Sequence, residues 1–252
     1  MDFTYSKYRY LLQTLKSSGY SFLTYENFCS SEFLPEKFVI LRHDVDAKPE
    51  NALMMASLEG RLGIKASYYF RFIPKTNQPD KIMSIAALGH EIGYQYEELS
   101  ILKGDENKAL LYFEEHLNYF RQFYPVRTIC MHGSPLSKFD NRDLWKIYNY
   151  RDFGIVGEPY FDVDFNDVFY LTDTGRCWDG EKFSVRDKVK SAFSQSYHTT
   201  SDIIVAAKAG TLPSRMMITT HPQRWTDNIF EWSAEFVAQN LKNIVKRIII
   251  RR

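Results

Sequence analysis

The sequence predicts an α/β fold, most simply an irregular (β/α) barrel of about seven parallel strands. Three observations lead to this prediction. Short apolar runs alternate with stretches of helical period along nearly the whole chain. Four polar clusters each stand where one of these runs stops. Finally, the first strand is not followed by a Gly-rich loop of the dinucleotide or Walker type, which disfavours nucleotide-binding versions of the fold.

The first half of the chain contains three expected strands, each followed by a helix. An opening helix over 6–18 precedes a short apolar run at 38–41, which ends in charge as buried strands do. Pro49 suits the first turn of a helix that runs to about residue 62, and Gly63 suits its end. Strands are then expected at 65–70 and 91–96, with a helix at 79–88 between them. The amphipathic stretch 107–123 is a further helix, closed by Pro125.

The second half repeats this order less regularly. Strands are expected at 127–131, 154–156, 168–171 and 216–220. A short helix is expected at 143–148, a second helix at 202–209 with Gly210 just past its end, and a closing helix at 229–245. Strand and helix thus alternate as in parallel sheets with helical crossovers.

Length and composition fit one large domain, which we place over residues 1–252 with an N-terminal helical extension at 1–36. The chain has 252 residues, of which 44% are hydrophobic and 25% charged, enough to bury a single core. Its net charge of +1 and pI near 7.7 give no global attraction to nucleic acid or to an anionic membrane. Neither is therefore an expected partner.

Cysteine usage and the N-terminus favour a cytoplasmic protein. Cys29, Cys130 and Cys177 are odd in number and far apart, which fits neither a disulfide framework nor a metal finger. The first residues lack a basic region followed by an apolar run, and no window approaches the ~20 apolar residues of a membrane span. We therefore expect reduced thiols and no membrane span.

Four polar clusters follow apolar runs, and they carry the candidate chemistry. The clusters are 42–46, 89–97, 130–135 and 219–225. They contain acids, amides and histidines. In barrel enzymes, catalytic groups from several strand ends converge on one face. This pattern is the main evidence for an enzyme.

Strand geometry places two carboxylates of the first cluster together. Side chains alternate between the faces of a strand, so Asp44 and Asp46 share the inner face while Val45 turns toward the helices. Close carboxylates repel, which raises one pKa or requires a cation. Both outcomes suit general-base catalysis or metal binding. The alternative for Asp46 is the N-cap of the helix that begins near Pro49.

The same alternation groups residues at three other strand ends. It pairs Gln95 with Glu97, Cys130 with His132, and Thr219 with His221. A lone histidine at a strand end is more often a hydrogen-bonded structural group than a ligand, but two that converge on one centre suggest a site. A divalent cation held by Asp and His could activate a water, with Asp44 as base and His221 as the acid that protonates the leaving group.

At these residues the chain resembles the polysaccharide deacetylase family, carbohydrate esterase family 4. Residues 89–93 match that family's Gly-His-Glu-Ile-Gly motif letter for letter. Asp44 stands where the family has its catalytic base, and His221 resembles its final-motif histidine, the general acid. The resemblance covers about residues 38–225. It implies a deacetylase-like barrel, a carbohydrate substrate and a divalent metal ion such as zinc.

The chain departs from the family at the metal ligands. The second Asp of the family aligns with Val45, and its two metal histidines align with Gln95 and Leu99. A glutamine can offer its carbonyl oxygen, although it binds transition metals more weakly than imidazole does. A replacement metal site is therefore expected from Asp46, His132 and Gln95, with Glu97 as an alternative.

Further residues are candidates for substrate binding. Asp173 and Trp178 follow the sixth expected strand, and Arg224 and Trp225 follow the last. Arg224 can bind an anionic group bidentately or form a structural salt bridge. The two tryptophans can wall a sugar pocket or pack in the core. The substrate-binding set that the sequence suggests is Glu97, Ser134, Asp173, Trp178, Arg224 and Trp225.

Three functions remain open from the sequence. The leading one is a metal-assisted hydrolase that removes an acyl group, such as acetyl, from an N-acylated sugar or polysaccharide. The second is a carbohydrate-binding protein that kept the barrel and lost the metal, which Val45, Gln95 and Leu99 favour. The third keeps the chemistry and acts on the amide of a small nitrogenous compound.

Overall fold

The computed structural model describes residues 1–179 and 188–250, with side chains up to residue 244. Its centre is a sheet of seven strands, all pairs of which are parallel. The main path runs β5-β4-β3-β2-β7-β6, and β1 pairs with the first half of β2. Among the described residues this path ends at β5 and β6. The sheet is therefore a curled half-barrel, and the predicted parallel α/β class is confirmed.

The strands agree with the predicted positions in most places. They are β1 (Ser21–Leu23), β2 (Phe38–Val45), β3 (Ser67–Phe70), β4 (Glu91–Tyr96), β5 (Ile129–Met131), β6 (Phe169–Thr172) and β7 (Arg215–Thr220). The number of strands equals the predicted seven, but one predicted strand is missing and one strand was not predicted. The strand predicted at 154–156 is absent, and only a single bridge joins Thr128 to Gly157 there. The three-residue β1, too short for a periodicity signal, takes its place in the count.

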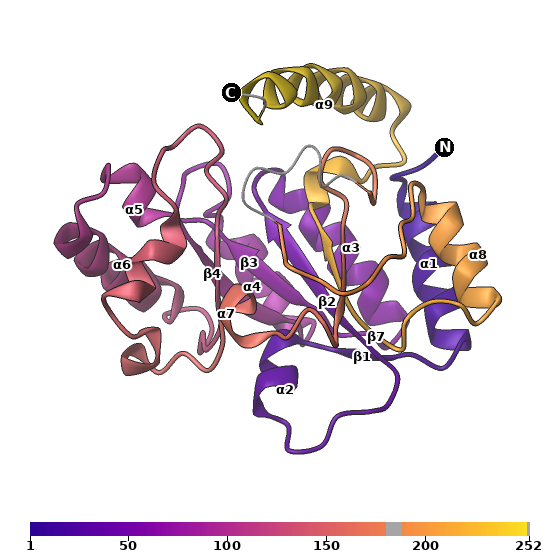
Figure 1. The fold of residues 1–252 in the computed structure, drawn as a ribbon, viewed down its shortest axis with the longest axis horizontal. Coiled ribbons are helices and arrows are strands. Elements are labelled where there is room, and N and C mark those ends of the chain that lie inside the picture. The colour runs from indigo at the N-terminus through magenta and orange to yellow at the C-terminus, as the bar shows by residue number, and fades with distance from the viewer. Residues whose placement is uncertain (180–187, 251–252) are drawn as a thin grey trace.

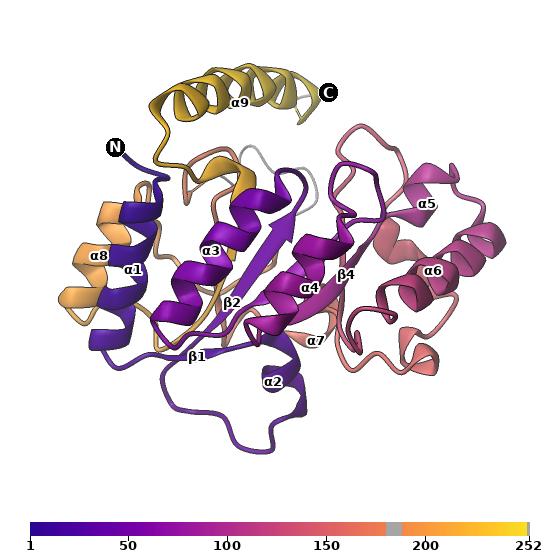
Figure 2. The ribbon, with the colours of Figure 1, turned by 180° about the vertical axis from the view of Figure 1, so that it is seen from behind.

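Helices cover the outer face of the sheet, as Figure 2 shows for α1, α3, α4 and α8. The long helices are α1 (Tyr5–Ser17), α3 (Pro49–Arg61), α4 (Pro79–Ala87), α6 (Glu106–Phe120), α8 (Thr200–Lys208) and α9 (Ile229–Ile250). The shorter ones are α2 (Tyr25–Ser30), α5 (Glu98–Ile101), α7 (Pro159–Asp162) and the 3₁₀ turns η1 (Asn141–Lys146), η2 (Tyr150–Phe153) and η4 (Pro222–Arg224). The short helix expected at 143–148 corresponds to η1.

Residues 1–36 contribute to the same layers as the rest of the chain. They were predicted as a helical extension, but β1 joins the sheet beside β2, and α1 contributes Leu11, Leu12 and Leu15 to the main core. The prediction of one domain over 1–252 stays a prediction.

The alternation along β2 fixes the two sides of the sheet. Val39, Leu41 and Val45 point to the large core beneath the helices, whereas Phe38 and Ile40 belong to a smaller cluster inside the half-barrel. Arg42 and Asp44 continue the inner side, where hydrophobic packing ends. The inner face of β2 is thus apolar at its start and polar at its carboxyl end. Asp44 lies on this inner face and Val45 faces the helices, as the alternation of side chains predicted.

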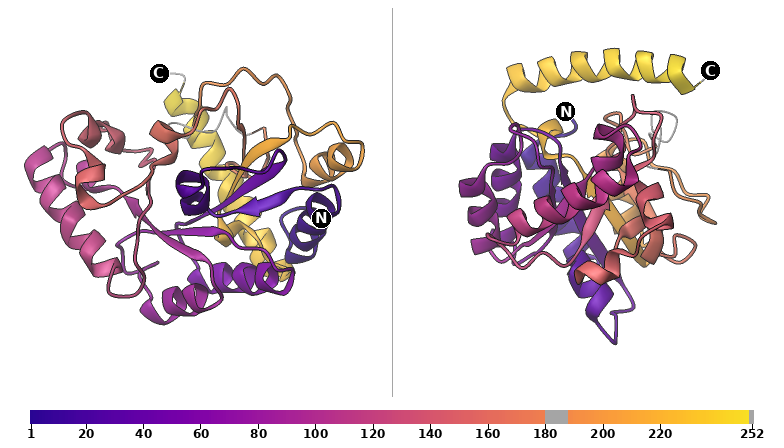
Figure 3. Two further views of the ribbon diagram at one scale, coloured as in Figure 1. Left: turned by 90° about the horizontal axis from the view of Figure 1, so that it is seen from below. Right: turned by 90° about the vertical axis from the view of Figure 1, so that its left-hand side faces the viewer.

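Helix α9 lies apart from the other helices. It crosses the top of the molecule in Figure 1 and in the right-hand view of Figure 3, on the side to which the β2 arrow points in Figure 2. No helix in the described part of the chain combines the length and apolar character needed to cross a bilayer.

Candidate functional site

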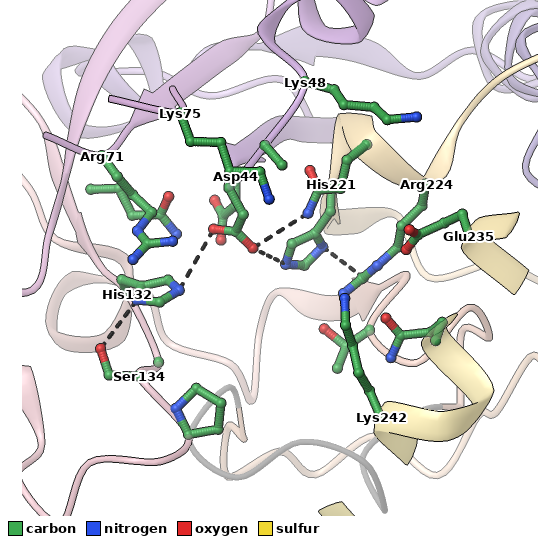
Figure 4. A pocket seen from close by; sticks show the side chains of 18 residues that line it. Asp44, Lys48, Arg71, Lys75, His132, Ser134, His221, Arg224, Glu235 and Lys242 are labelled. Atoms are coloured by element: carbon green, nitrogen blue, oxygen red, sulfur yellow. Dashed lines mark hydrogen bonds and ion pairs between the residues drawn. The ribbon is translucent and has the colours of Figure 1, made fainter. Parts of the chain in front are cut away.

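A cavity of about 390 Å³ opens at the carboxyl ends of the strands. Side chains from several strands line it: Asp44 is the penultimate residue of β2, Gln95 lies in β4, His132 follows β5, and His221 follows β7. Figure 4 shows Asp44, His132 and His221 around the cavity, with Glu235 and Lys242 of α9 on one side. The convergence predicted from the sequence is present, because parallel strands bring their carboxyl ends to one edge.

Asp44 is held by an arginine from its own strand. The Arg42 guanidinium donates from Nε to Oδ1 at 2.8 Å and from Nη2 to Oδ2 at 2.6 Å. Both side chains are nearly buried, at 1% and 7% exposure, so the contact is a desolvated bidentate pair. The pair keeps the Asp44 carboxylate in one orientation at the cavity wall.

Asp46 lies between the two predicted histidines. Its Oδ1 is 3.8 Å from His132 Nε2 and its Oδ2 is 3.8 Å from His221 Nε2. Burial raises the pKa of the Asp46 carboxyl, but the two imidazoles, Arg71 and Arg224 outweigh burial and lower it. Asp46 does not cap α3, whose N-cap residue is Lys48. The capping alternative is therefore wrong.

Glu97 and Arg71 orient His132. Glu97 accepts two hydrogen bonds from the Arg71 guanidinium at 2.7 Å each, and Oε2 lies 2.8 Å from His132 Nδ1. Ser134 Oγ is 3.1 Å from the same nitrogen. Burial lowers the pKa of His132, but the hydrogen bond to Glu97 and the charge of Asp46 outweigh it and raise that pKa. With Nδ1 held, Nε2 faces Asp46 across the cavity.

Asp173 orients His221 in the same way. It lies 2.6 Å from His221 Nδ1 and accepts hydrogen bonds from Arg224 Nη1 at 2.6 Å and Trp225 Nε1 at 2.8 Å. Burial raises the pKa of Asp173, but Arg224 and His221 outweigh it and lower that pKa to about 2. The carboxylate is thus an anion that fixes the imidazole ring and leaves Nε2 directed at Asp46.

The side chain of Gln95 is buried at the cavity wall, and its Oε1 accepts no hydrogen bond from a described residue. The same holds for Oδ1 of Asp46. The other two positions that the resemblance aligns with metal ligands face elsewhere, since Val45 and Leu99 are buried in the main core. Of these three described residues, Gln95 is the one that lines the cavity.

The structure separates the remaining predicted residues into three places. Ser134 and Arg224 line the cavity. Glu97 and Asp173 lie behind His132 and His221 and hold them, so their predicted contact with substrate becomes a contact with histidine. Trp178 and Trp225, predicted as a possible sugar wall, are buried in the main core.

The two tryptophans pack with the N-terminal segment. Phe3 contacts both, with its ring centroid 6.3 Å from that of Trp178 and 5.1 Å from that of Trp225. Trp225 also contacts Tyr8 at 5.1 Å between centroids. Their predicted role in substrate binding is corrected to packing, because large aromatics gain most by burial.

Several lining residues were not predicted. They are Ala47, Lys48, Arg71, Lys75, Thr174, Gln223, Glu235, Gln239 and Lys242. The last three lie on α9, and no periodicity in the sequence tells where a closing helix crosses the molecule.

Another group of potential metal ligands lies outside this cavity. Within the described ranges, Cys177, Asp179 and His198 are the one set of three His, Cys, Asp or Glu residues whose ligand atoms lie within 4.8 Å of one another. His198 Nδ1 is 2.8 Å from Asp179 Oδ1, and the His198 side chain is 65% exposed. Asp46, His132 and His221 are more widely spaced than this group.

Comparison with known proteins finds similarity among solved structures, whereas no family model and no curated protein matches the chain. A CE4 family pseudoenzyme from Bacillus anthracis has 14% identity and a TM-score of 0.45 over 81% of this chain and 60% of its own. The chain is similar to carbohydrate esterase family 4 proteins. It spans about three fifths of the first of these structures.

Two further solved structures of this family are similar. A mutant of the peptidoglycan deacetylase PdaC from Bacillus subtilis has 10% identity and a TM-score of 0.40, over 85% of this chain and 98% of its own. The Xyl-CE4 domain of a multidomain xylanase from the Trinervitermes trinervoides hindgut metagenome has 12% identity and a TM-score of 0.38. That match covers 84% of this chain and 85% of the domain.

The Gly-His-Glu-Ile-Gly segment at residues 89–93 has a structural role in this chain. A β-carbon at Gly93 would overlap the Tyr69 ring, and Gly89 has a φ of +83°, which favours glycine. His90 Nδ1 accepts from the Ala66 amide at 3.1 Å. Glu91 accepts from Ser67 Oγ at 2.6 Å, and its burial raises its pKa. The motif holds β3 and β4 together and places Gln95 at the cavity.

Proposed function

We propose that the chain is a hydrolase that removes an acyl group from an N-acylated sugar or polysaccharide, with Asp44 as general base and His221 as general acid. The observation that supports this most is the arrangement at the cavity wall. Two imidazoles, each held at Nδ1 by a carboxylate, present Nε2 toward Asp46 in the cavity that Asp44 also lines. Carboxylate-backed histidines of this kind serve proton transfer or metal binding.

The proposed reaction needs one proton acceptor and one proton donor. A water attacks the acyl carbon while Asp44 takes its proton, which gives a tetrahedral intermediate. The C–N bond then breaks as His221 Nε2 donates a proton to the departing nitrogen. The products are a carboxylic acid and a free amine. Arg42 keeps the Asp44 carboxylate aimed at the water, and Asp173 stabilises the charged imidazole.

Asp46, His132 and Gln95 would hold a divalent cation. The donor set fits one, because Asp46 Oδ1 and Gln95 Oε1 lack hydrogen-bond partners among the described residues and His132 presents Nε2. When bound, such an ion polarises a carbonyl and lowers the pKa of a bound water. The amide of Gln95 makes this site weaker than one with a third charged or imidazole ligand.

Acetate release tests the proposed activity. The purified chain is incubated with N-acetylated amino sugars and their oligomers, with zinc, cobalt or manganese added. The Asp44→Asn variant is expected to be slower by about 10²–10⁴-fold, because a general base is lost. Asp167→Asn is the matched control, since Asp167 is 55% exposed and pairs with Arg215 away from the cavity.

The outcome is interpreted together with folding. Asp44→Asn removes the negative charge that pairs with the buried Arg42 guanidinium. The thermal unfolding of this variant is therefore measured beside that of His221→Gln. Two folded variants with wild-type rates would remove Asp44 and His221 from the mechanism.

The location in the cytoplasm stays a prediction.

Replacing the amide ligand tests the metal site. Gln95→His is expected to tighten zinc binding by about ten- to a hundredfold, because an imidazole is a stronger donor than an amide oxygen. Zinc titration followed by calorimetry gives this readout without any substrate. The control is Asn77→His, at a half-buried position that does not line the cavity. Equal zinc affinity in wild type and Gln95→His would argue against a cation at this position.

A second candidate function is carbohydrate binding without turnover. It is favoured by Gln95 at a position where the family has a ligand histidine, and by Val45 and Leu99 packed in the core. Saturable binding of an oligosaccharide to a chain that releases no acid with any added metal would establish it.

A further inference from the structure

Helix α9 turns its polar side toward the body of the protein. Gln239 and Asn243 are 4% and 7% exposed, and Asn243 Nδ2 donates to the carbonyl of Gly175 at 3.0 Å. Glu235, Gln239 and Lys242 line the cavity. The helix is therefore fixed by hydrogen bonds on the side where a helix of a globular protein normally packs its apolar residues.

The opposite side of α9 is apolar and exposed. Four residues spaced by seven, four and three positions form one stripe on the helix, which we call the outer face. They are Phe230, Val237, Leu241 and Ile244, with exposures of 83%, 58%, 60% and 56%. No described element covers them. In Figure 1 this helix forms the upper boundary of the molecule.

Charge distinguishes the kinds of surface that suit the outer face. The sequence that follows it, residues 245–252, contains four basic residues and no acidic one, namely Lys246, Arg247, Arg251 and Arg252. An anionic surface attracts them, and an amphipathic helix with neighbouring cations is typical of binding to the headgroup region of membranes.

We propose that the outer face of α9 binds the surface of a membrane that contains anionic lipid. The helix lies in the interface with Phe230, Val237, Leu241 and Ile244 among the lipids and does not cross the bilayer. The cavity beneath α9 is then about one helix diameter, ~10 Å, from the headgroups. This inference does not depend on the proposed hydrolase activity, because it follows from the outer face and the basic residues alone.

Vesicle flotation of the full chain tests the proposal. Vesicles of phosphatidylcholine alone are compared with vesicles of equal parts phosphatidylcholine and phosphatidylglycerol. We expect the chain to float with the mixed vesicles, and to do so less as salt is raised. The double variant Val237→Asp with Leu241→Asp should lower the partition coefficient roughly tenfold or more, since two apolar groups are replaced by anions.

A matched control separates lipid contact from general surface change. Leu111 on α6 is 65% exposed, close to the 60% of Leu241, so Leu111→Asp should float like the wild type. The proposal is overturned if the wild type does not bind the mixed vesicles, or if Leu111→Asp loses as much binding as the α9 variant. It is also overturned if sedimentation shows a dimer that the α9 variant abolishes and vesicle binding is absent.

Discussion

Replacing Asp173 by asparagine is expected to lower turnover roughly 10³–10⁴-fold, the scale seen when the carboxylate behind a catalytic histidine is removed. Asp173 lies 2.6 Å from His221 Nδ1 and is fully buried. An amide there carries no charge to offset a positive imidazole, so proton donation from His221 Nε2 to the leaving nitrogen should slow. The measurement is kcat for acetate release against pH.

The acid stability of this variant gives an independent readout. The folded-state pKa of Asp173 is lowered from 3.8 to about 2. The stabilisation from its charge is therefore complete above pH 4 and is lost as pH falls toward 2, about 2 kcal/mol in all. In Asp173→Asn the free energy of unfolding should fall less steeply over this interval. The assigned role would be contradicted if both the rate of acetate release and the loss of unfolding free energy between pH 4 and pH 2 were the same as in the wild type. Asp167→Asn serves as control.

Replacing Glu59 by glutamine is expected to destabilise the protein by about 3–5 kcal/mol, because it removes the charge from a buried ionic network. Glu59 is fully buried and accepts hydrogen bonds from Tyr8 at 2.5 Å and Tyr68 at 2.8 Å. His43 Nε2 lies 2.9 Å from its Oε1. Burial raises the pKa of Glu59, but His43 and His90 outweigh it and lower that pKa. The measurement is denaturant unfolding near neutral pH.

A surface pair provides the comparison for this prediction. Glu231 and Lys48 are 46% and 41% exposed at 2.9 Å, so Glu231→Gln should change stability by no more than about 1 kcal/mol. The network also reaches the site. His43 Nδ1 lies 2.6 Å from Thr220 Oγ1, and these two residues directly precede Asp44 and His221 in the chain. Similar stability changes in both variants would show that the Glu59 network is not a main support of the fold.

The sequence predicted the features that depend on strand period and strand ends. Asp44 and Asp46 both line the cavity while Val45 is in the core, because side chains alternate along β2. His132 and His221 reach the same cavity because their strands are parallel. These properties need only local pattern and sheet direction.

Other features depend on tertiary contacts that local pattern does not encode. Trp178 and Trp225 follow strands as sugar-binding residues do, yet Phe3 and Tyr8 from the N-terminus cover them. Glu97 and Asp173 hold histidines because Arg71 and Arg224 compensate their burial. The short β1 and the course of α9 over the cavity are equally long-range. For these features the sequence shows which residue types are present, but their neighbours depend on contacts between segments far apart in the chain.

The most direct test of the central claim is simultaneous measurement of free carboxylic acid and free amine from an N-acylated sugar. Hydrolysis of the amide predicts that both appear in equal amounts, with the metal-loaded wild type and not with Asp44→Asn. If neither product appears with any substrate or metal while the sugar still binds, the cavity is a binding site and the hydrolase proposal is wrong.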